Sequence, residues 1–125
     1  MAIKIYVASK VKWRYLWHSW RRNIPSNVQI NARWLDVYDV TGDAGCAELW
    51  QTIVEDVRDC DALIVLRADG DEQLKGAYIE IGIALALGKP ILAVGLDDHT
   101  FSKHPLVTCV GSVPDAFDIV CQKIK

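Results

Sequence analysis

The sequence predicts a three-layer α/β domain in which a five-stranded parallel sheet lies between helices. Two observations predict it. Short apolar segments rich in β-branched residues alternate along the chain with longer segments in which apolar residues recur every three or four positions. Two of the short segments, residues 62–67 and 91–96, are nearly uninterrupted apolar runs, as in strands that are covered on both faces. With right-handed crossovers, residues 1–125 form one flavodoxin-like or Rossmann-like domain, for which we expect strand order 2-1-3-4-5.

The N-terminal part of the chain supplies the first strand and an aromatic helix. Residues 3–9 are rich in β-branched and apolar side chains and predict a strand. Residues 11–22 have large apolar side chains at helical spacing, including Trp13, Trp17 and Trp20. This tryptophan stripe favours the protein core or a subunit interface over a platform for stacking bases.

An acidic loop joins the second strand to the second helix. The strand is predicted over residues 28–35 and the loop over residues 36–45. In a parallel sheet this loop lies at the edge that binds ligands, where Asp36 is a candidate binding residue. Asp43 either shares that role or caps the next helix. That helix is indicated by apolar residues at helical spacing from residue 46 to residue 57.

The second half of the chain continues the alternation. Strands are predicted over residues 62–67, 91–96 and 107–110, and helices from near residue 75 to residue 88 and from about residue 114 to residue 123. Gly88 followed by Pro90 is the expected end of the first of these helices. Gly82 inside it costs about 1 kcal/mol relative to Ala, which predicts close packing on the sheet or a ligand. For His99 and His104, a surface position is favoured over a metal or proton-transfer role.

One carboxylate interrupts the most apolar of these helices. Between Gly76 and Gly88 the only ionisable side chains are Tyr78 and Glu80. Either Glu80 faces water and interacts with the helix dipole, or it points into a pocket at the carboxyl edge of the sheet. The turn-forming loop 69–72 just before the helix favours the pocket, because ligands bind at that edge in open α/β folds.

Composition limits the classes of function. Of the 125 residues 51% are hydrophobic and 24% charged, which is typical of a folded domain. No apolar run is long enough for a membrane span, so a cytoplasmic location without membrane contact is predicted. The four cysteines are widely spaced and are interpreted as small buried side chains rather than disulfide partners or zinc ligands. No metal or organic cofactor is indicated.

Charge is unevenly distributed, although the net charge is only −2. Residues 1–35 contain seven Lys or Arg and no acid, whereas residues 36–75 contain eleven acids and three bases. This asymmetry indicates a basic face for an anionic ligand or complementary surfaces in an oligomer, with ordinary solvated surface as the alternative. An acidic domain without a recognised binding motif argues against a nucleic-acid partner.

Three segments carry a family resemblance. They are Ile5-Tyr6-Val7-Ala8-Ser9, Asp61-Ala62-Leu63-Ile64-Val65, and Gly76-Ala77-Tyr78-Ile79-Glu80-Ile81-Gly82-Ile83-Ala84 with Gly88-Lys89-Pro90. On these segments residues 3–96 resemble the nucleoside 2-deoxyribosyltransferase-like family, and the layout looks like its small phage and bacterial members. The resemblance implies cleavage or transfer of an N-glycosidic bond in nucleosides or their 5′-monophosphates, with Glu80 as nucleophile and Tyr6 beside it. It also implies a homo-oligomer, because the family often completes its sites across subunits.

The chain departs from the family pattern at three places. Leu74 and Ile53 stand where transferases of the family have Asp, the first of which helps to protonate the base. No Asn follows Asn31, whereas the family uses one near the C-terminus. Asp69 or Asp71 is then the candidate general acid.

A phosphate-binding site is a further hypothesis. A cation at a helix start opposes the dipole, whereas a bound anion there is stabilised by free backbone N–H groups. We therefore expect Lys75, the amides of Gly76 and Ala77, and Ser9 and Lys10 at the end of the first strand to bind substrate, with the lysines holding a 5′-phosphate. A solvated Lys75 is the alternative.

Three functions from different classes remain open. The first is an N-glycosidase or deoxyribosyltransferase. The second is a catalytically silent module that senses or sequesters a nucleotide, which the missing Asp residues favour. The third is a structural partner protein that uses the tryptophan stripe.

Overall fold

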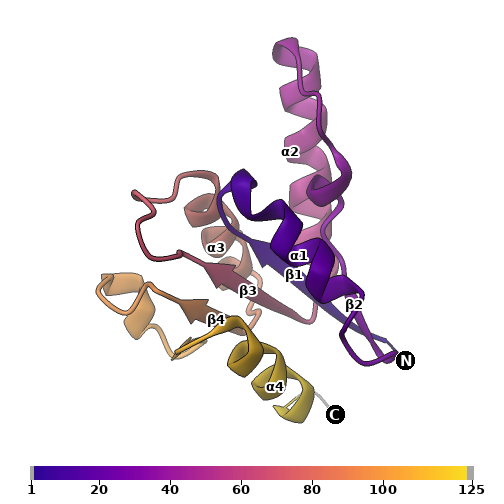
Figure 1. Cartoon of the computed structure of the whole chain (residues 1–125). Coiled ribbons are helices and arrows are strands. Elements are labelled where there is room, and N and C mark those ends of the chain that lie inside the picture. The colour runs from indigo at the N-terminus through magenta and orange to yellow at the C-terminus, as the bar shows by residue number, and fades with distance from the viewer. Residues whose placement is uncertain (1, 124–125) are drawn as a thin grey trace.

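The structure, a computed structural model, describes residues 2–123 and places five parallel strands in one sheet (Figure 1). The strands are β1 (Ile3–Ala8), β2 (Val28–Ile30), β3 (Ala62–Leu66), β4 (Ile91–Val94) and β5 (Val107–Val110). Their order is β2-β1-β3-β4-β5, so the predicted fold class and strand order are confirmed. In this order the chain leaves β1 toward one edge of the sheet and β3 toward the other, which makes the β1/β3 boundary the topological switch point.

Four helices cover the two faces of the sheet. They are α1 (Arg14–Arg21), α2 (Gly42–Asp59), α3 (Gly76–Ala86) and α4 (Val113–Lys123), with 3₁₀ turns η1 (Val11–Trp13), η2 (Arg33–Asp36) and η3 (Thr100–Lys103). Helices α1 and α4 share one face, where Trp20 stacks on Phe117 with ring centroids 5.2 Å apart. Helices α2 and α3 pack together on the opposite face, and α2 extends well beyond the sheet (Figure 1).

The centre of the core is the pair β1 and β3. Tyr6 lies opposite Leu63 in their register, and both side chains are fully buried. Every residue of β3 is buried, as its uninterrupted apolar sequence predicts. Each fully buried aliphatic side chain of this kind contributes about 1.5–3 kcal/mol. A rigid central pair therefore supports the residues that follow each strand.

The second strand is shorter than predicted. It ends at Ile30 rather than at residue 35, because the chain turns at η2. Trp34 points inward and its indole N–H donates to the Val7 carbonyl at 2.9 Å, while the Asp56 carboxylate accepts the Arg33 backbone N–H at 2.8 Å. These two bonds draw the chain away from the sheet edge.

Helix α2 begins earlier than predicted, at Gly42 rather than at residue 46. Its N-cap is Thr41, so Asp43 is not the cap residue and lies in the first turn, where a carboxylate interacts favourably with the helix dipole. The last four residues of the predicted acidic loop, 42–45, are therefore helix. The predicted end of α3 is confirmed, because Gly88 follows the helix with a φ of 72°.

The tryptophan stripe belongs to the core. Trp17 is fully buried and its indole N–H donates to the Ser9 hydroxyl at 2.8 Å. Trp20 packs on α4, and the Trp13 N–H donates to the Asp71 carboxylate at 3.0 Å. The core position is therefore confirmed for Trp17, whereas Trp13 and Trp20 are only partly buried and a role of this helix in a subunit interface stays a prediction.

Two further predictions about small side chains need correction. All four cysteines are free, but only Cys60 is buried, Cys121 is half-buried, and Cys46 and Cys109 are exposed. Gly82 is exposed, and no atom lies within 4 Å of the position a Cβ would take, so close packing does not explain it within this chain.

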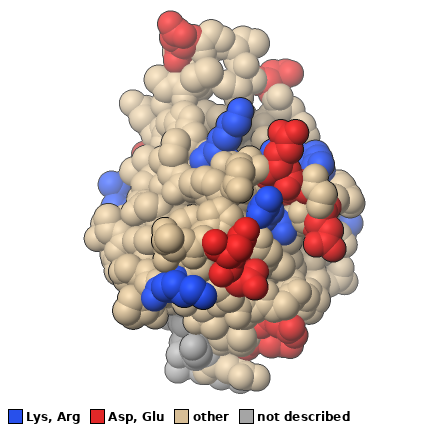
Figure 2. All heavy atoms as spheres, turned by 90° about the vertical axis from the view of Figure 1, so that its left-hand side faces the viewer, with Lys and Arg blue, Asp and Glu red and all other residues tan. Residues whose placement is uncertain are grey.

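The uneven charge distribution is partly resolved by ion pairs inside the chain. Lys12 pairs with Asp71 at 3.2 Å, Arg21 with Asp36 at 3.4 Å, and Arg33 with Asp56 at 2.9 Å. Toward the carboxyl ends of the strands, basic and acidic side chains lie side by side on the surface (Figure 2). Three of the seven basic residues of the N-terminal segment are thus paired with acids from the following segment.

Two searches of the described residues found nothing. Among residues 2–123 no helix is long and apolar enough to cross a membrane. In the same part of the chain no three His, Cys, Asp or Glu side chains cluster as metal ligands would.

Candidate active site

A pocket of about 530 Å³ opens at the switch point, beyond the carboxyl ends of β1 and β3. The segments after β1 and β3 and the flank of α2 form its walls. Its lining residues are Ser9, Lys10, Val11, Lys12, Trp34, Leu49, Trp50, Ile53, Glu72, Leu74, Lys75, Gly76, Ala77 and Glu80. The volume lies within the range of small-molecule sites in enzymes.

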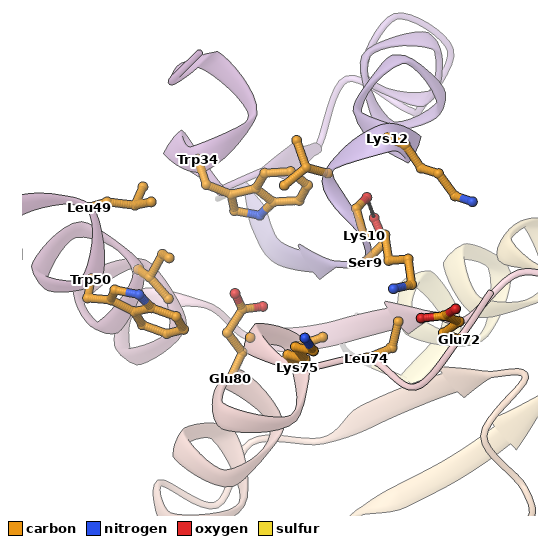
Figure 3. Close-up of a pocket in the computed structure, with 14 residues that line it drawn as sticks. Ser9, Lys10, Lys12, Trp34, Leu49, Trp50, Glu72, Leu74, Lys75 and Glu80 are labelled. Atoms are coloured by element: carbon orange, nitrogen blue, oxygen red, sulfur yellow. Dashed lines mark hydrogen bonds between the residues drawn. The ribbon is translucent and has the colours of Figure 1, made fainter. Parts of the chain in front are cut away.

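Glu80 lies at the middle of this pocket. It is on the second turn of α3, and its carboxylate points from the helix into the cavity (Figure 3). The residue is only 7% exposed, and no Lys, Arg or His side chain of residues 2–122 lies within ion-pair distance of it. Burial raises the pKa of Glu80 to about 8, although the Tyr6 hydroxyl acts in the opposite direction. Of the two interpretations of Glu80, the structure therefore supports the one in which the side chain points into a pocket rather than into solvent.

Tyr6 lies within β1, and its side chain interacts with Glu80. Burial, and then the Glu80 charge, hold the pKa of Tyr6 well above its usual range, so the phenol stays protonated. Its buried hydroxyl is close enough to lower the pKa of Glu80, yet no hydrogen bond of regular geometry joins it to any described residue. A buried hydroxyl without a full partner costs about 1–3 kcal/mol, and such groups are few in native structures.

The two sides of the pocket differ in chemistry. Trp34, Leu49 and Trp50 gather on one side of Glu80, and Ser9, Lys10, Lys12 and Glu72 lie on the other (Figure 3). Lys75 is beside Glu80 at the start of α3. A bound molecule with one flat apolar end and one anionic end matches this division.

The lysines of the polar side are not equivalent. Lys12 pairs with Asp71, and its side chain is 61% exposed. Lys10 and Lys75 have no ion-pair partner among residues 2–123. The Ser9 hydroxyl donates to the Lys10 carbonyl at 2.9 Å and accepts from Trp17, which fixes the end of β1 at the pocket rim.

Six of the residues singled out in the sequence meet at this pocket. They are Ser9, Lys10, Lys75, Gly76, Ala77 and Glu80, with Tyr6 directly behind. Asp36, Asp69 and Asp71 do not line it. Asp36 is exposed on η2, where Arg21 lies 3.4 Å and His18 3.9 Å from its carboxylate.

Asp71 serves the structure of the loop before α3. Its side chain is buried and accepts hydrogen bonds from the Ala68 N–H at 2.9 Å and the Trp13 N–H at 3.0 Å, beside the Lys12 ion pair. Burial raises the pKa of Asp71, but these bonds and Lys12 outweigh it, so that the net pKa is lowered. An ionised and fully bonded carboxylate is unsuited to donate a proton, which argues against Asp71 as general acid. Asp69 is exposed outside the lining.

Four pocket residues were not singled out as site residues in the sequence. Trp34 lies in a segment predicted as strand, and Trp50 and Leu49 follow the ordinary helical pattern of a core-facing residue. Glu72 lines the pocket but is exposed. No local signal separates these residues from others, because the η2 turn and the α2–α3 packing bring them to the pocket.

His99 lies in a separate network. It is half-buried, and its ring nitrogens lie 2.8 Å from the Asp98 carboxylate and 3.0 Å from the Tyr78 hydroxyl. Phe101 packs against the same rings. This network ties the first turn of α3 to the β4–η3 loop.

No family model and no curated protein matches the sequence. Among solved structures, the chain is similar to a CMP N-glycosidase, BcmB, from Clostridium botulinum. The TM-score is 0.55 at 15% sequence identity, and the superposition covers 95% of this chain and 98% of that chain. At this identity the likeness shows a shared fold over nearly the whole of both chains.

Proposed function

We propose that the protein cleaves the N-glycosidic bond of a nucleotide or nucleoside with Glu80 as the nucleophile. The observation that carries this proposal is a carboxylate that is 7% exposed, lacks a cationic partner among the described residues, and projects into a pocket at the switch point. Similarity of fold to a CMP N-glycosidase supports it at the level of the fold. Uncompensated burial of a carboxylate is costly and is typical of catalytic groups.

The chemistry has two steps. First, one Glu80 oxygen bonds to the anomeric carbon while the C1′–N bond breaks and its electron pair leaves with the base. Then water bonds to C1′, its proton passes to solvent, and the Glu80 carboxylate is released, so that the configuration at C1′ is retained. A second base in place of water gives transfer instead of hydrolysis. The Tyr6 hydroxyl has a free proton to stabilise the ionised carboxylate before attack.

A 5′-phosphate matches the polar side of the pocket. Lys10 and Lys75 lie there beside the first N–H groups of α3, and both backbone and lysine charges favour an anion. Lys75→Ala should then weaken binding of a nucleotide and leave the corresponding nucleoside unchanged, as measured by calorimetry. Lys103→Ala, on η3 away from the pocket, is the matched control. Equal binding of the nucleotide by wild type and Lys75→Ala would contradict phosphate contact.

The experiment for the reaction is base release from a panel of nucleosides and 5′-monophosphates, followed by chromatography and mass spectrometry. Glu80→Gln should abolish release and retain binding. Glu48→Gln, on the exposed surface of α2 outside the pocket, should keep wild-type activity. Intact mass spectrometry of the wild type should show a sugar adduct that the Glu80→Gln protein lacks.

A silent nucleotide-binding module is the second candidate. It is favoured by the apolar Leu74 and Ile53 in the pocket wall, which give a base no carboxyl partner. Thermal stabilisation by a nucleotide without base release under any condition would support this candidate over the enzyme.

A further inference from the structure

The apolar side of the pocket contains no side chain that protonates a departing base. Trp34, Leu49 and Trp50 form this side (Figure 3), and the apolar residues Ile53 and Leu74 also line the pocket. None of them has a carboxyl, hydroxyl, amide or amino group, and the Trp34 indole N–H is already donated to the Val7 carbonyl at 2.9 Å. A neutral base takes the electron pair of the broken C1′–N bond and therefore needs a proton as it leaves. On this side nothing supplies one.

The nearby acids do not fill this role. Glu72 is exposed and lies on the opposite side of Glu80 (Figure 3). Asp71 is ionised and already binds Trp13, Ala68 and Lys12. The leaving group best suited to the pocket is consequently one that departs without a proton.

The same side of the pocket is suited to a cation. Trp50 presents its indole to the cavity, and no Lys or Arg of the described residues lies over its ring. Arg14 lies 6.0 Å from the Trp34 ring, but it comes from α1 and is not part of the pocket lining. The indole is the strongest aromatic partner for a cation. Glu80, buried without a basic neighbour, supplies a negative charge beside it once it is ionised.

We propose that the preferred substrate is an N-glycoside whose leaving group is cationic, namely a pyridinium nucleotide, bound with its ring at Trp50 and its phosphate at Lys10 and Lys75. This inference rests on the proposed function. When Glu80 bonds to C1′, the electron pair of the C1′–N bond returns to the pyridinium nitrogen, and the ring leaves as a neutral pyridine. No proton donor is required, and the zwitterionic substrate matches the separation of indole and lysine side chains across Glu80.

The experiment compares nicotinamide mononucleotide with cytidine 5′-monophosphate as substrates of the full-length protein. We expect kcat/KM for the pyridinium nucleotide to be at least tenfold higher, with both activities lost in Glu80→Gln. Reduced nicotinamide mononucleotide has nearly the same shape and an uncharged ring, and should inhibit with a Ki at least tenfold above the KM of the oxidised form.

Variants of Trp50 test the role of the indole. Trp50→Leu should raise KM for the pyridinium nucleotide about tenfold more than for cytidine 5′-monophosphate, and Trp50→Phe should restore most of the difference. Val54→Ala, one turn further along α2 and outside the pocket, is the control. Equal losses for both substrates would overturn the cation site.

The outcomes separate the two proposals. Glu80-dependent release of cytosine at an equal or higher kcat/KM overturns the preference for a cation and leaves the proposed function intact. Absence of cleavage for both substrate classes overturns the proposed function and this inference together.

Discussion

At neutral pH Glu80 is mostly protonated, whereas its proposed role as the nucleophile requires the ionised carboxylate. Its pKa is raised by burial to about 8, so only a minority of molecules carry the carboxylate at pH 7. An open pocket lets a substrate change this balance, because a cation or a developing positive charge at C1′ stabilises the ionised form. Ionising Glu80 is therefore costly in the free protein, and binding of a positively charged group reduces that cost.

This cost predicts how the stability of the protein depends on pH. The pKa of Glu80 is about 8 in the folded state against 4.5 in the reference state, so between these values the folded state retains a proton that the unfolded state releases. Stability therefore falls as pH rises from about 4.5 to about 8. Glu80→Gln lacks this effect, and its advantage in unfolding free energy over wild type should grow by about 4 kcal/mol between pH 5 and pH 9. Urea denaturation at both pH values measures the difference, and a pH-independent difference would contradict a buried carboxyl.

The pKa of Glu80, and the effect of the Tyr6 hydroxyl on it, predict how activity depends on pH. Because Glu80 must be ionised to attack, kcat/KM should rise with pH and reach half its maximum near pH 8. The Tyr6 hydroxyl lowers the pKa of Glu80, so Tyr6→Phe should move this midpoint to higher pH. Because a buried hydroxyl without a full partner costs free energy, its loss should not lower the stability. A lower midpoint in Tyr6→Phe would show that the phenol does not support the carboxylate.

At the scale of the elements, the loop between β3 and α3 forms one wall of the pocket. Asp71 holds this loop to η1 by accepting from the Trp13 and Ala68 N–H groups. Asp71→Ala leaves these donors without an acceptor, and each costs about 1–3 kcal/mol when it remains buried. We expect a loss of unfolding free energy in that range and a higher KM. Asp69→Ala, on the exposed part of the same loop, should change neither quantity, and the pair is compared by thermal denaturation and steady-state kinetics.

The expected effect on stability of replacing a glycine by Ala differs among three positions, and this gives a second prediction. Gly95 has a φ of 79°, and a Cβ there would lie 2.1 Å from the Arg67 carbonyl oxygen, so Gly95→Ala should destabilise the protein by about 3 kcal/mol or more. Gly70→Ala, with a φ of 86° and no atom nearby, isolates the backbone cost at about 1 kcal/mol. Gly82→Ala on the exposed side of α3 should stabilise by about 0.5–1 kcal/mol. Thermal denaturation ranks the three, and a destabilised Gly82→Ala would point to a contact outside this chain.

At the scale of the whole molecule, ligand binding and folding are linked. A molecule that binds only the folded state at 100 times its Kd raises the unfolding free energy by about 2.7 kcal/mol. The Glu80→Gln protein retains the rest of the pocket and should show this stabilisation with a 5′-monophosphate without consuming it. Thermal denaturation at increasing ligand concentration measures it, and an unchanged Tm at every concentration would exclude nucleotide binding.

The sequence alone determined the architecture and the position of the main candidate residue. Apolar periodicity is a local property, and it was sufficient for the alternation of strands and helices and for the position of α3, whose end at Gly88 follows from local backbone chemistry. Glu80 was identified because a carboxylate is conspicuous in an apolar helix. These features depend on neighbours within a few residues along the chain.

The tertiary structure decided which other groups accompany Glu80. Trp34 reaches the pocket because η2 ends β2 early, and Asp71 is excluded from it because Trp13, distant in sequence, takes its carboxylate. The raised pKa of Glu80 likewise depends on burial by several elements at once. Burial and pairing are set by segments far apart in the chain, whereas periodicity is set by adjacent residues, and this is why the sequence predicted the fold but not the full composition of the site.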